Sequence, residues 1–211
     1  MFGITNYGVF LLSALLLNLT PGTDTMYILG RSISQGRKAG IYSAMGITLG
    51  GLVHTLLAAF GLSIILTKSV LLFMIIKILG AVYLVYLGIN MLLAKKAPEK
   101  DGLNNQQNIP LKKIFFQGLL TNITNPKVAL FFLAFIPQFI DANHSSPLPF
   151  LLLGLTFCCT GGLWSLVVAN FSSIFTKRLR NNTNIEFILN KAMGFIFIAM
   201  SIALLKTKSM D

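Results

Sequence analysis

Residues 18–24 read Asn-Leu-Thr-Pro-Gly-Thr-Asp and lie inside an apolar segment that runs from about residue 7 to residue 30. A proline inside a helix has no N–H to donate, and its ring clashes with the carbonyl group four residues back, here that of Leu17. Asp24 follows three residues after Pro21 and is the only acidic residue placed well inside an apolar stretch. We therefore expect an apolar helix that is broken at Pro21 and carries a carboxylate beside the break.

A similar sequence, Asn-Ile-Thr-Asn-Pro-Lys, occupies residues 122–127 inside another apolar segment. The two copies are offset by 104 residues (122 − 18), and Asn, an aliphatic residue and Thr coincide before a proline in each copy. The first copy carries the acid Asp24 and the second carries the base Lys127. A second shared pattern, Lys-x-x-Gly, begins at Lys77 and again at Lys191. Two matches in corresponding segments indicate an internal duplication.

The composition excludes a soluble protein. Hydrophobic residues make up 55% of the 211 residues and charged residues 11%, and the mean hydropathy is +0.76. Because roughly a quarter of the residues of a soluble domain are charged, we expect an all-α integral membrane protein embedded in the lipid bilayer. The net charge is +11, but no soluble basic face is available for nucleic acid. We find no metal-ligand spacing, nucleotide motif or nucleophile triad in a suitable context, so we expect no cofactor, no metal and no catalytic residue.

Six apolar segments are each long enough to cross the hydrocarbon core, which requires roughly 20 residues. They cover about residues 7–29, 39–66, 70–94, 113–140, 148–175 and 184–205. The sequence therefore predicts six transmembrane helices, of which helices 1 and 4 are broken at Pro.

Basic residues are distributed unequally between the connecting loops. The loops after the first, third and fifth segments hold eleven Lys and Arg residues, whereas the other side holds Lys68, Lys206 and Lys208. The positive-inside rule then predicts three cytoplasmic loops and both termini outside the cytoplasm. Three spans per half make the halves inverted repeats, a pattern typical of secondary transporters with broken helices. We expect one transmembrane domain over residues 1–211, with repeats 1–96 and 112–211 joined by a cytoplasmic linker, 97–111.

Three stretches of the chain carry a family resemblance: the sequence at 18–24, Arg-Ser-Ile-Ser-Gln-Gly-Arg-Lys-Ala-Gly at 31–40, and Asn-Pro-Lys-Val-Ala-Leu-Phe-Phe-Leu-Ala-Phe-Ile-Pro-Gln-Phe at 125–139. Together they resemble the LysE/RhtB family of bacterial exporters of lysine, homoserine/threonine, leucine and related amino acids. The resemblance extends over essentially the whole chain. It implies proton-coupled export of an amino acid across the bacterial inner membrane. We favour a neutral or homoserine/threonine-type substrate, because a basic substrate would call for a second buried acid.

Candidate substrate-binding residues gather at the two breaks. We expect Asp24 to receive the substrate ammonium and exchange it for a proton; alternatively it N-caps the helix that resumes after Pro-Gly. Lys127 lies too deep to reach the surface easily, and we expect it to meet a carboxylate; alternatively it forms a structural ion pair with Asp24. The asparagines either contact substrate or satisfy backbone groups freed by proline. The full set is Asn18, Thr20, Pro21, Gly22, Asp24, Asn122, Asn125, Pro126 and Lys127, with Asp24 as the proton-coupling group.

Other functions remain open from the sequence. A channel or accessory membrane protein is one alternative, and an intramembrane enzyme that uses Asp24, Lys127 and His54 is a less favoured one. A lone histidine such as His54 more often bonds to a neighbouring helix, and we expect Trp164 to pack or face lipid. We expect the second, third and fifth segments to shape the pocket for the substrate side chain. A homo-oligomer is compatible with the sequence.

Overall fold

The computed structural model of the chain describes residues 2–62, 70–93, 109–141 and 146–172, and positions 191, 194, 195, 198, 199, 201, 202 and 205. Regular structure in these residues is helical, apart from a single antiparallel bridge between Ile4 and Ile140. The helical elements are α1 (Tyr7–Leu19), α2 (Thr23–Gln35), α3 (Arg37–Leu57), η1 (Ala58–Leu62), α5 (Val70–Leu93), α6 (Leu111–Ile123), α7 (Pro126–Leu130), η2 (Phe131–Phe135), η3 (Ile136–Phe139) and α8 (Leu148–Asn170).

Four predicted segments correspond to apolar helices or helix pairs that are long enough to cross a membrane. Residues 37–62 and 148–170 form two such helices. Two bent pairs also qualify: α1 with α2, inclined by 45°, and α6 with the helix that runs from Pro126 to Phe139, inclined by 47°. Helix α5 covers the third predicted segment. These features confirm an all-α membrane protein; most of the predicted sixth segment and most of the linker at 97–111 fall outside the described residues.

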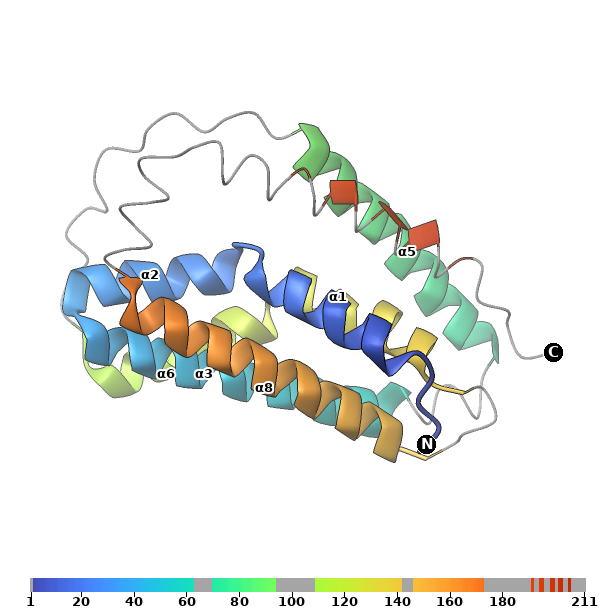
Figure 1. Cartoon of the computed structure of the whole chain (residues 1–211), viewed down its shortest axis with the longest axis horizontal. Helices are drawn as coiled ribbons and strands as arrows, with labels where there is room; N and C mark the ends of the chain where they lie inside the picture. The colour runs from blue at the N-terminus through green and yellow to red at the C-terminus, as the bar shows by residue number, and fades with distance from the viewer. Residues whose placement is uncertain are drawn as a thin grey trace.

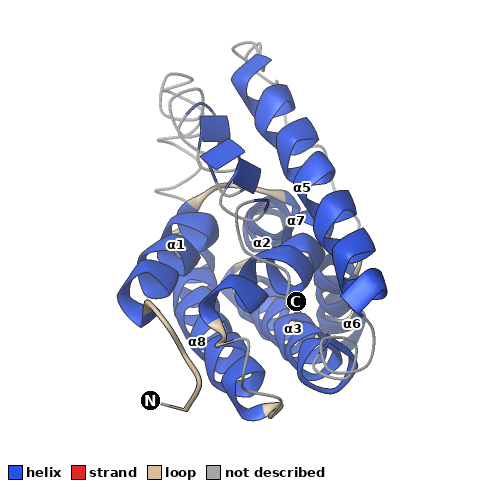
Figure 2. Ribbon diagram, turned by 90° about the vertical axis from the view of Figure 1, so that its right-hand side faces the viewer, coloured by secondary structure: helices blue, strands red, loops and turns tan. Residues whose placement is uncertain are grey.

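Helix α3 lies at the centre of the bundle and packs mainly against α6 and α8 (Figures 1 and 2). Glycines allow the close approach of α3 to α6, as small residues commonly do between membrane helices. A Cβ atom added to Gly46 of α3 would lie 2.1 Å from the carbonyl oxygen of Phe115, and one added to Gly118 of α6 would lie 2.8 Å from that of Ser43. This contact brings the end of α6, and therefore the second break, against the middle of α3.

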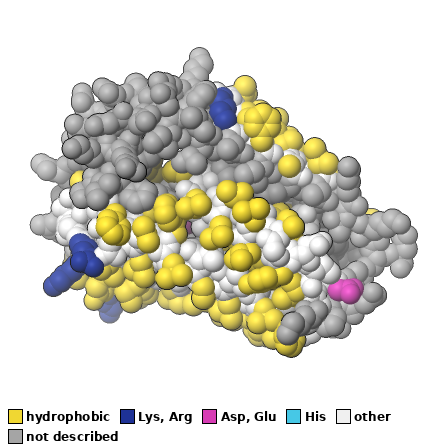
Figure 3. Space-filling model, viewed as in Figure 1, with side chains coloured by type: hydrophobic (Ala, Val, Ile, Leu, Met, Phe, Trp, Pro, Cys, Tyr) yellow, Lys and Arg dark blue, Asp and Glu magenta, His cyan; other side chains and the backbone are white. Residues whose placement is uncertain are grey.

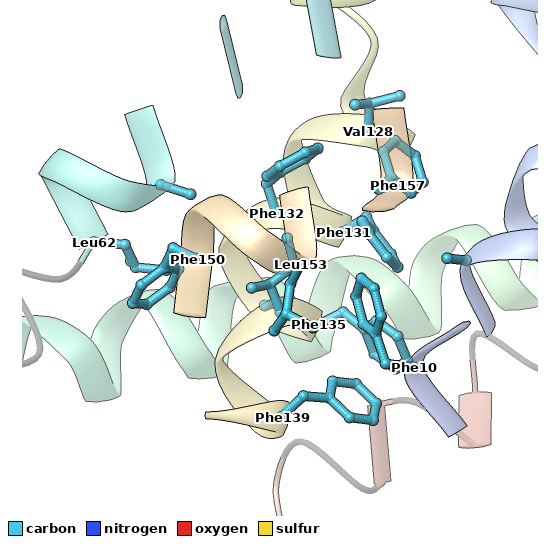
Figure 4. Close-up of a cluster of buried hydrophobic side chains, with 14 of the residues drawn as sticks. Phe10, Leu62, Val128, Phe131, Phe132, Phe135, Phe139, Phe150, Leu153 and Phe157 are labelled. Atoms are coloured by element: carbon cyan, nitrogen blue, oxygen red, sulfur yellow. The ribbon is translucent and has the colours of Figure 1, made fainter. Parts of the chain in front are cut away.

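An aromatic cluster packs the helix after the second break against α1 and α8 (Figure 4). The rings of Phe131 and Phe157 stack with centroids 4.5 Å apart, and Phe10 meets Phe139 edge to face at 5.4 Å. Such pairs stabilise a core beyond the burial of their area. The cluster therefore holds η2 and η3 in place, so that α7 starts at a fixed position beside α1.

Segments expected on a common side of the membrane lie at a common end of the molecule. The backbone N–H of Thr5 donates to the carbonyl of Phe139 (2.8 Å), and that of Asp141 donates to Gly3 (2.8 Å). At the opposite end, the Gln35 side chain donates to the carbonyl of Ile109 (2.9 Å). The face in Figure 3 is largely hydrophobic between the two ends, with Lys and Arg atoms at the end where α2 leads into α3. This surface is suited to a bilayer.

Helix α5 lies beside the described positions of the sixth segment (Figure 1). A Cβ atom added to Gly194 would lie 2.8 Å from the carbonyl oxygen of Gly88. The Ser201 hydroxyl donates to the carbonyl of Ala81 (3.0 Å), and the Lys191 ammonium donates to that of Leu92. The second Lys-x-x-Gly pattern therefore lies at a close helix contact.

Candidate functional site

The first break exposes backbone carbonyls at the end of α1. The last bond of that helix is donated by the N–H of Thr20 to Leu16 (3.2 Å). Pro21 has no N–H, so the carbonyl of Leu17 loses its donor within the helix. That carbonyl instead accepts a hydrogen bond from the Lys127 ammonium at 2.8 Å, and the carbonyl of Thr20 accepts another at 3.0 Å. A lysine from the second break therefore caps the first.

The second break is shorter and is capped by its own sequence. Helix α6 ends at Ile123, and the Asn125 side chain accepts a hydrogen bond from the backbone N–H of Lys127 at 3.1 Å. Pro126 occupies the first position of α7, where a missing N–H costs nothing. The carbonyl of Asn122 accepts from the N–H of Asn125 (3.0 Å) and lies 3.2 Å from the Nε2 atom of His54.

Asp24 is the second residue of α2, so its carboxylate lies in the first turn, where the helix dipole favours a negative charge. The N-cap of α2 is Gly22, which makes no side-chain capping bond, so Asp24 is not the N-cap. Its Oδ2 atom accepts a hydrogen bond of 2.7 Å from the amide of Asn122. Its Oδ1 atom is buried and has no hydrogen-bond partner. One oxygen of this partly buried carboxylate therefore has no hydrogen bond.

Lys127 and Asp24 interact electrostatically without direct contact. Their charges influence each other, but within the described residues they form no ion pair of 4.0 Å or less. The ammonium lies instead at the carbonyl end of α1, where the helix dipole favours a cation. This position leaves Asp24 to other partners.

A cavity of about 60 Å³ lies between the two breaks, α3 and α8. Seven of the nine predicted site residues line it, namely Asn18, Thr20, Gly22, Asp24, Asn122, Asn125 and Lys127. Pro21 and Pro126 do not line it, and Pro126 is exposed. The Asn18 amide donates to the hydroxyl of Thr160 (3.0 Å) and the carbonyl of Phe157 (3.4 Å), so it joins α1 to α8 at the edge of the cavity.

Residues of α3 and α8 that the sequence did not single out as binding residues complete the cavity wall: Ile47, Thr48, Phe157, Cys158, Gly161, Gly162, Trp164 and Ser165. Leu17, Thr25 and Val128 also contribute. The adjacent pair of glycines in α8 was the available signal, but it equally indicates helix packing. Trp164 lines the cavity, where we expected packing or lipid contact. The second and fifth segments shape the cavity as expected, whereas none of the described side chains of α5, the third segment, lines it.

The described residues contain no group of three or more His, Cys, Asp or Glu side chains that could hold a metal ion. The chemistry of the cavity is that of a partly buried acid, a partly buried base and three amides, surrounded by apolar and small residues. Such a site can bind a ligand that carries both charges.

Comparisons with known proteins identify relatives of this chain. The sequence model of the LysE type translocator family matches residues 15–208. The uncharacterized membrane protein YrhP of Bacillus subtilis (strain 168) is 33% identical over 196 residues, which cover 90% of this chain and 93% of that protein. The leucine efflux proteins of Klebsiella pneumoniae and Salmonella choleraesuis are 30% identical over 209 residues and 29% identical over 210, covering 99% of this chain and 98% of each. No solved structure shows a significant match.

Proposed function

The chain belongs to the LysE type translocator family, and from that premise we propose that it is a secondary active exporter of an amino acid. Membership confirms the family expected from the sequence and a transporter rather than an enzyme. The leucine efflux proteins among its relatives support the export of an amino acid. The observation that carries the proposal is the cavity between the breaks, whose described lining contains a partly buried acid and a partly buried base.

Asp24 binds the substrate ammonium in this proposal. A buried acceptor without a partner costs about 1–3 kcal/mol, and the Oδ1 atom of Asp24 is such an acceptor. A substrate ammonium would satisfy it, while the Asn122 amide continues to hold the Oδ2 atom. This accounts for a carboxylate placed at membrane depth, where charged residues usually serve a binding or transport role.

Lys127 and the amides bind the substrate carboxylate. An ammonium has three N–H donors, and Lys127 gives two of them to Leu17 and Thr20. The third remains for a carboxylate in the cavity. In this pose the substrate presents its ammonium to Asp24 and its carboxylate to the ammonium of Lys127, which lies at the carbonyl end of α1.

Coupling to protons follows from the charge of the substrate. A zwitterion has no net charge, so the membrane potential alone does not expel it. One proton entering per substrate adds about 2.3 kcal/mol per 100 mV. Asp24 is the acid best placed to exchange the substrate ammonium for that proton, and we propose it as the coupling group.

A neutral aliphatic amino acid is the substrate class that we propose. The cavity wall opposite the charged residues includes Ile47, Phe157 and Trp164, which suit an apolar side chain. The leucine efflux relatives support the same class. Asp24 is the one acid in the lining, so a second cation on the substrate would have no partner.

The proposed architecture consists of two inverted three-helix repeats, 1–96 and 112–211, joined by a cytoplasmic linker in the inner membrane. Helices 1 and 4 are broken at Pro in this scheme, and both termini lie outside the cytoplasm. The two bends of 45° and 47° support this scheme. The hydrogen bonds that join the N-terminus to residues 139–141 at one end of the molecule, and Gln35 to Ile109 at the other end, support it as well. Single cysteines at Asn104 and Asn143, in a background without Cys158 and Cys159, should be labelled from the cytoplasm and from outside, respectively. Labelling of the Asn104 cysteine by an impermeant reagent in intact cells would contradict the topology.

Counterflow in proteoliposomes tests the transport class. Vesicles preloaded with leucine, threonine or lysine are offered the labelled amino acid outside. We expect trans-stimulation by leucine, less by threonine and none by lysine. Flux without trans-stimulation would indicate a channel, and no flux of any amino acid would overturn the proposed function.

A further inference from the structure

His54 lies on α3 behind the cavity, outside its lining. The side chain is 8% exposed, and its ring stacks on Phe132 with centroids 5.6 Å apart and planes inclined by 21°. The Nε2 atom is 3.2 Å from the carbonyl oxygen of Asn122. Because a carbonyl only accepts hydrogen bonds, this contact assigns the proton of the neutral ring to Nε2.

The carbonyl of Asn122 needs this donor. In an uninterrupted helix it would accept from the N–H of residue 126, which is a proline and has none. The N–H of Asn125 supplies one bond in a tight turn (3.0 Å), and His54 supplies the other. At membrane depth freed backbone groups must find partners in the protein or in a wet cavity. His54 therefore holds the backbone of Asn122 in place near the end of α6, and with it the position of the Asn122 side chain.

The two breaks are capped reciprocally. The carbonyl freed by Pro21 in the first half accepts from Lys127 of the second half. The carbonyl freed by Pro126 in the second half accepts from His54 of the first. The Asn122 amide then continues the contact to Asp24 at 2.7 Å. A continuous connection thus runs from His54 through Asn122 to the acid of the first break.

We propose that His54 is a positioning residue for substrate binding, which holds the Asn122 amide on the Oδ2 atom of Asp24 and so leaves the Oδ1 atom to a donor from the substrate. This role rests on the proposed function of Asp24. It requires an N–H donor at the Nε2 position and no change in its protonation. Among the described residues, Asp24 is the charged group that acts on the ring from a facing element, and in this role it exchanges no proton with the ring.

Three variants test the proposal in counterflow with labelled leucine. His54→Leu removes the donor, and His54→Gln keeps an N–H donor of similar reach. Ser43→Ala is the matched control, since it removes a buried hydroxyl of α3 that donates to the carbonyl of Ala39 in its own helix. We expect His54→Leu to raise KM about tenfold with little change in maximal rate, the size expected when a charged group loses one hydrogen bond. We expect His54→Gln and Ser43→Ala to stay within about twofold of the wild type.

The double variant His54→Leu/Asn122→Ala separates positioning from general stability. It should be no worse in KM than Asn122→Ala alone, because the connection is already cut. An unchanged KM with a lower yield of folded His54→Leu would overturn the proposal in favour of a structural role. If His54→Gln is as impaired as His54→Leu and shifts the pH profile of transport, the ring relays protons and the proposal is wrong.

Thermal unfolding in detergent without substrate gives a measurement that does not depend on transport. The effects of His54→Leu and Asp24→Asn on the melting temperature should be non-additive if Asn122 connects the two residues. Additive effects would overturn the connection even where counterflow supports export. Non-additive effects in a protein that transports no amino acid would leave the connection intact and reject the proposed function.

Discussion

The two helix breaks look alike in sequence but differ in how they are held. The first has three residues between its helices, Thr20 to Gly22, and its N-cap glycine makes no capping bond. The second has two, Thr124 and Asn125, and the asparagine caps the helix that follows. The first break therefore depends on the second for its partners, since Lys127 supplies the donors for its carbonyls.

The shorter second gap changes the register between the two similar sequences. Asn18 and Asn122 are 104 residues apart (122 − 18), whereas Asp24 and Lys127 are 103 apart (127 − 24). Because the gap loses one residue, Asp24 and Lys127 occupy the same place, the second residue of α2 and of α7. An acid there is favoured by the helix dipole and a base is not. Lys127 compensates by placing its ammonium at the carbonyl end of α1.

The largest effect that we expect in this comparison comes from Lys127→Met, which keeps the apolar stem and removes the ammonium. The carboxylate of the substrate loses a charge-assisted hydrogen bond, worth about 1.5–3 kcal/mol, and two carbonyls of the first break lose their donor. Apparent affinity for leucine in counterflow should fall about a hundredfold, as 3 kcal/mol implies. Lys112→Met, at an exposed position of α6, serves as the control. Affinity within twofold of the wild type in Lys127→Met would show that the first break needs no partner from the second.

A smaller effect is expected at Gly50, which packs against the side chain that joins the two breaks. A Cβ atom added there would lie 2.7 Å from the Cβ and Oδ1 atoms of Asn122, so the Asn122 amide must move away from Asp24. Gly50→Ala should lower the apparent affinity about tenfold, the loss of one hydrogen bond to a charged group. Gly8→Ala in α1, where nothing lies within 4 Å, should have no effect. If Gly50→Ala and Gly8→Ala have the same apparent affinity for leucine, the position of the Asn122 amide does not affect substrate binding.

The smallest effect concerns the caps themselves. Asn125→Ala removes the cap of the second break and should lower the free energy of unfolding by about 1 kcal/mol. Gly22→Ser offers a hydroxyl to the uncapped first break and should raise it by a few tenths of a kcal/mol. The added Cβ atom meets Lys127 only at an ordinary distance of 3.8 Å. Thermal unfolding in detergent measures both changes. A loss of stability in Gly22→Ser would contradict the view that the first break lacks a cap that the second break has.

The sequence allowed the breaks and their charged residues to be predicted, because proline, a buried acid and a buried base are rare inside apolar segments. Seven of the nine predicted residues line one cavity for that reason. The same reasoning could not decide which atoms Lys127 would meet. Its partners are backbone carbonyls, which have no signature in the side-chain sequence.

The side of α8 that faces the cavity could not be predicted, since that helix is apolar on every side. A helix without a polar face gives no indication of which side turns inward. Gly161, Gly162 and Trp164 face the cavity because α8 packs on α3 and α1, which is a property of the assembled bundle. The same limit explains why α5 was expected at the cavity although it lies elsewhere.

Uphill transport by Asp24→Asn tests the central claim, that the acid of the first break binds the substrate ammonium and the coupling proton in turn. The variant and the wild type are reconstituted in proteoliposomes, and accumulation of labelled leucine is measured under an imposed proton gradient. The asparagine retains the size and hydrogen bonding of the side chain but cannot release a proton. We predict a folded protein that accumulates no leucine against its gradient, beside a wild type that does. Accumulation by Asp24→Asn at the level of the wild type would contradict the account.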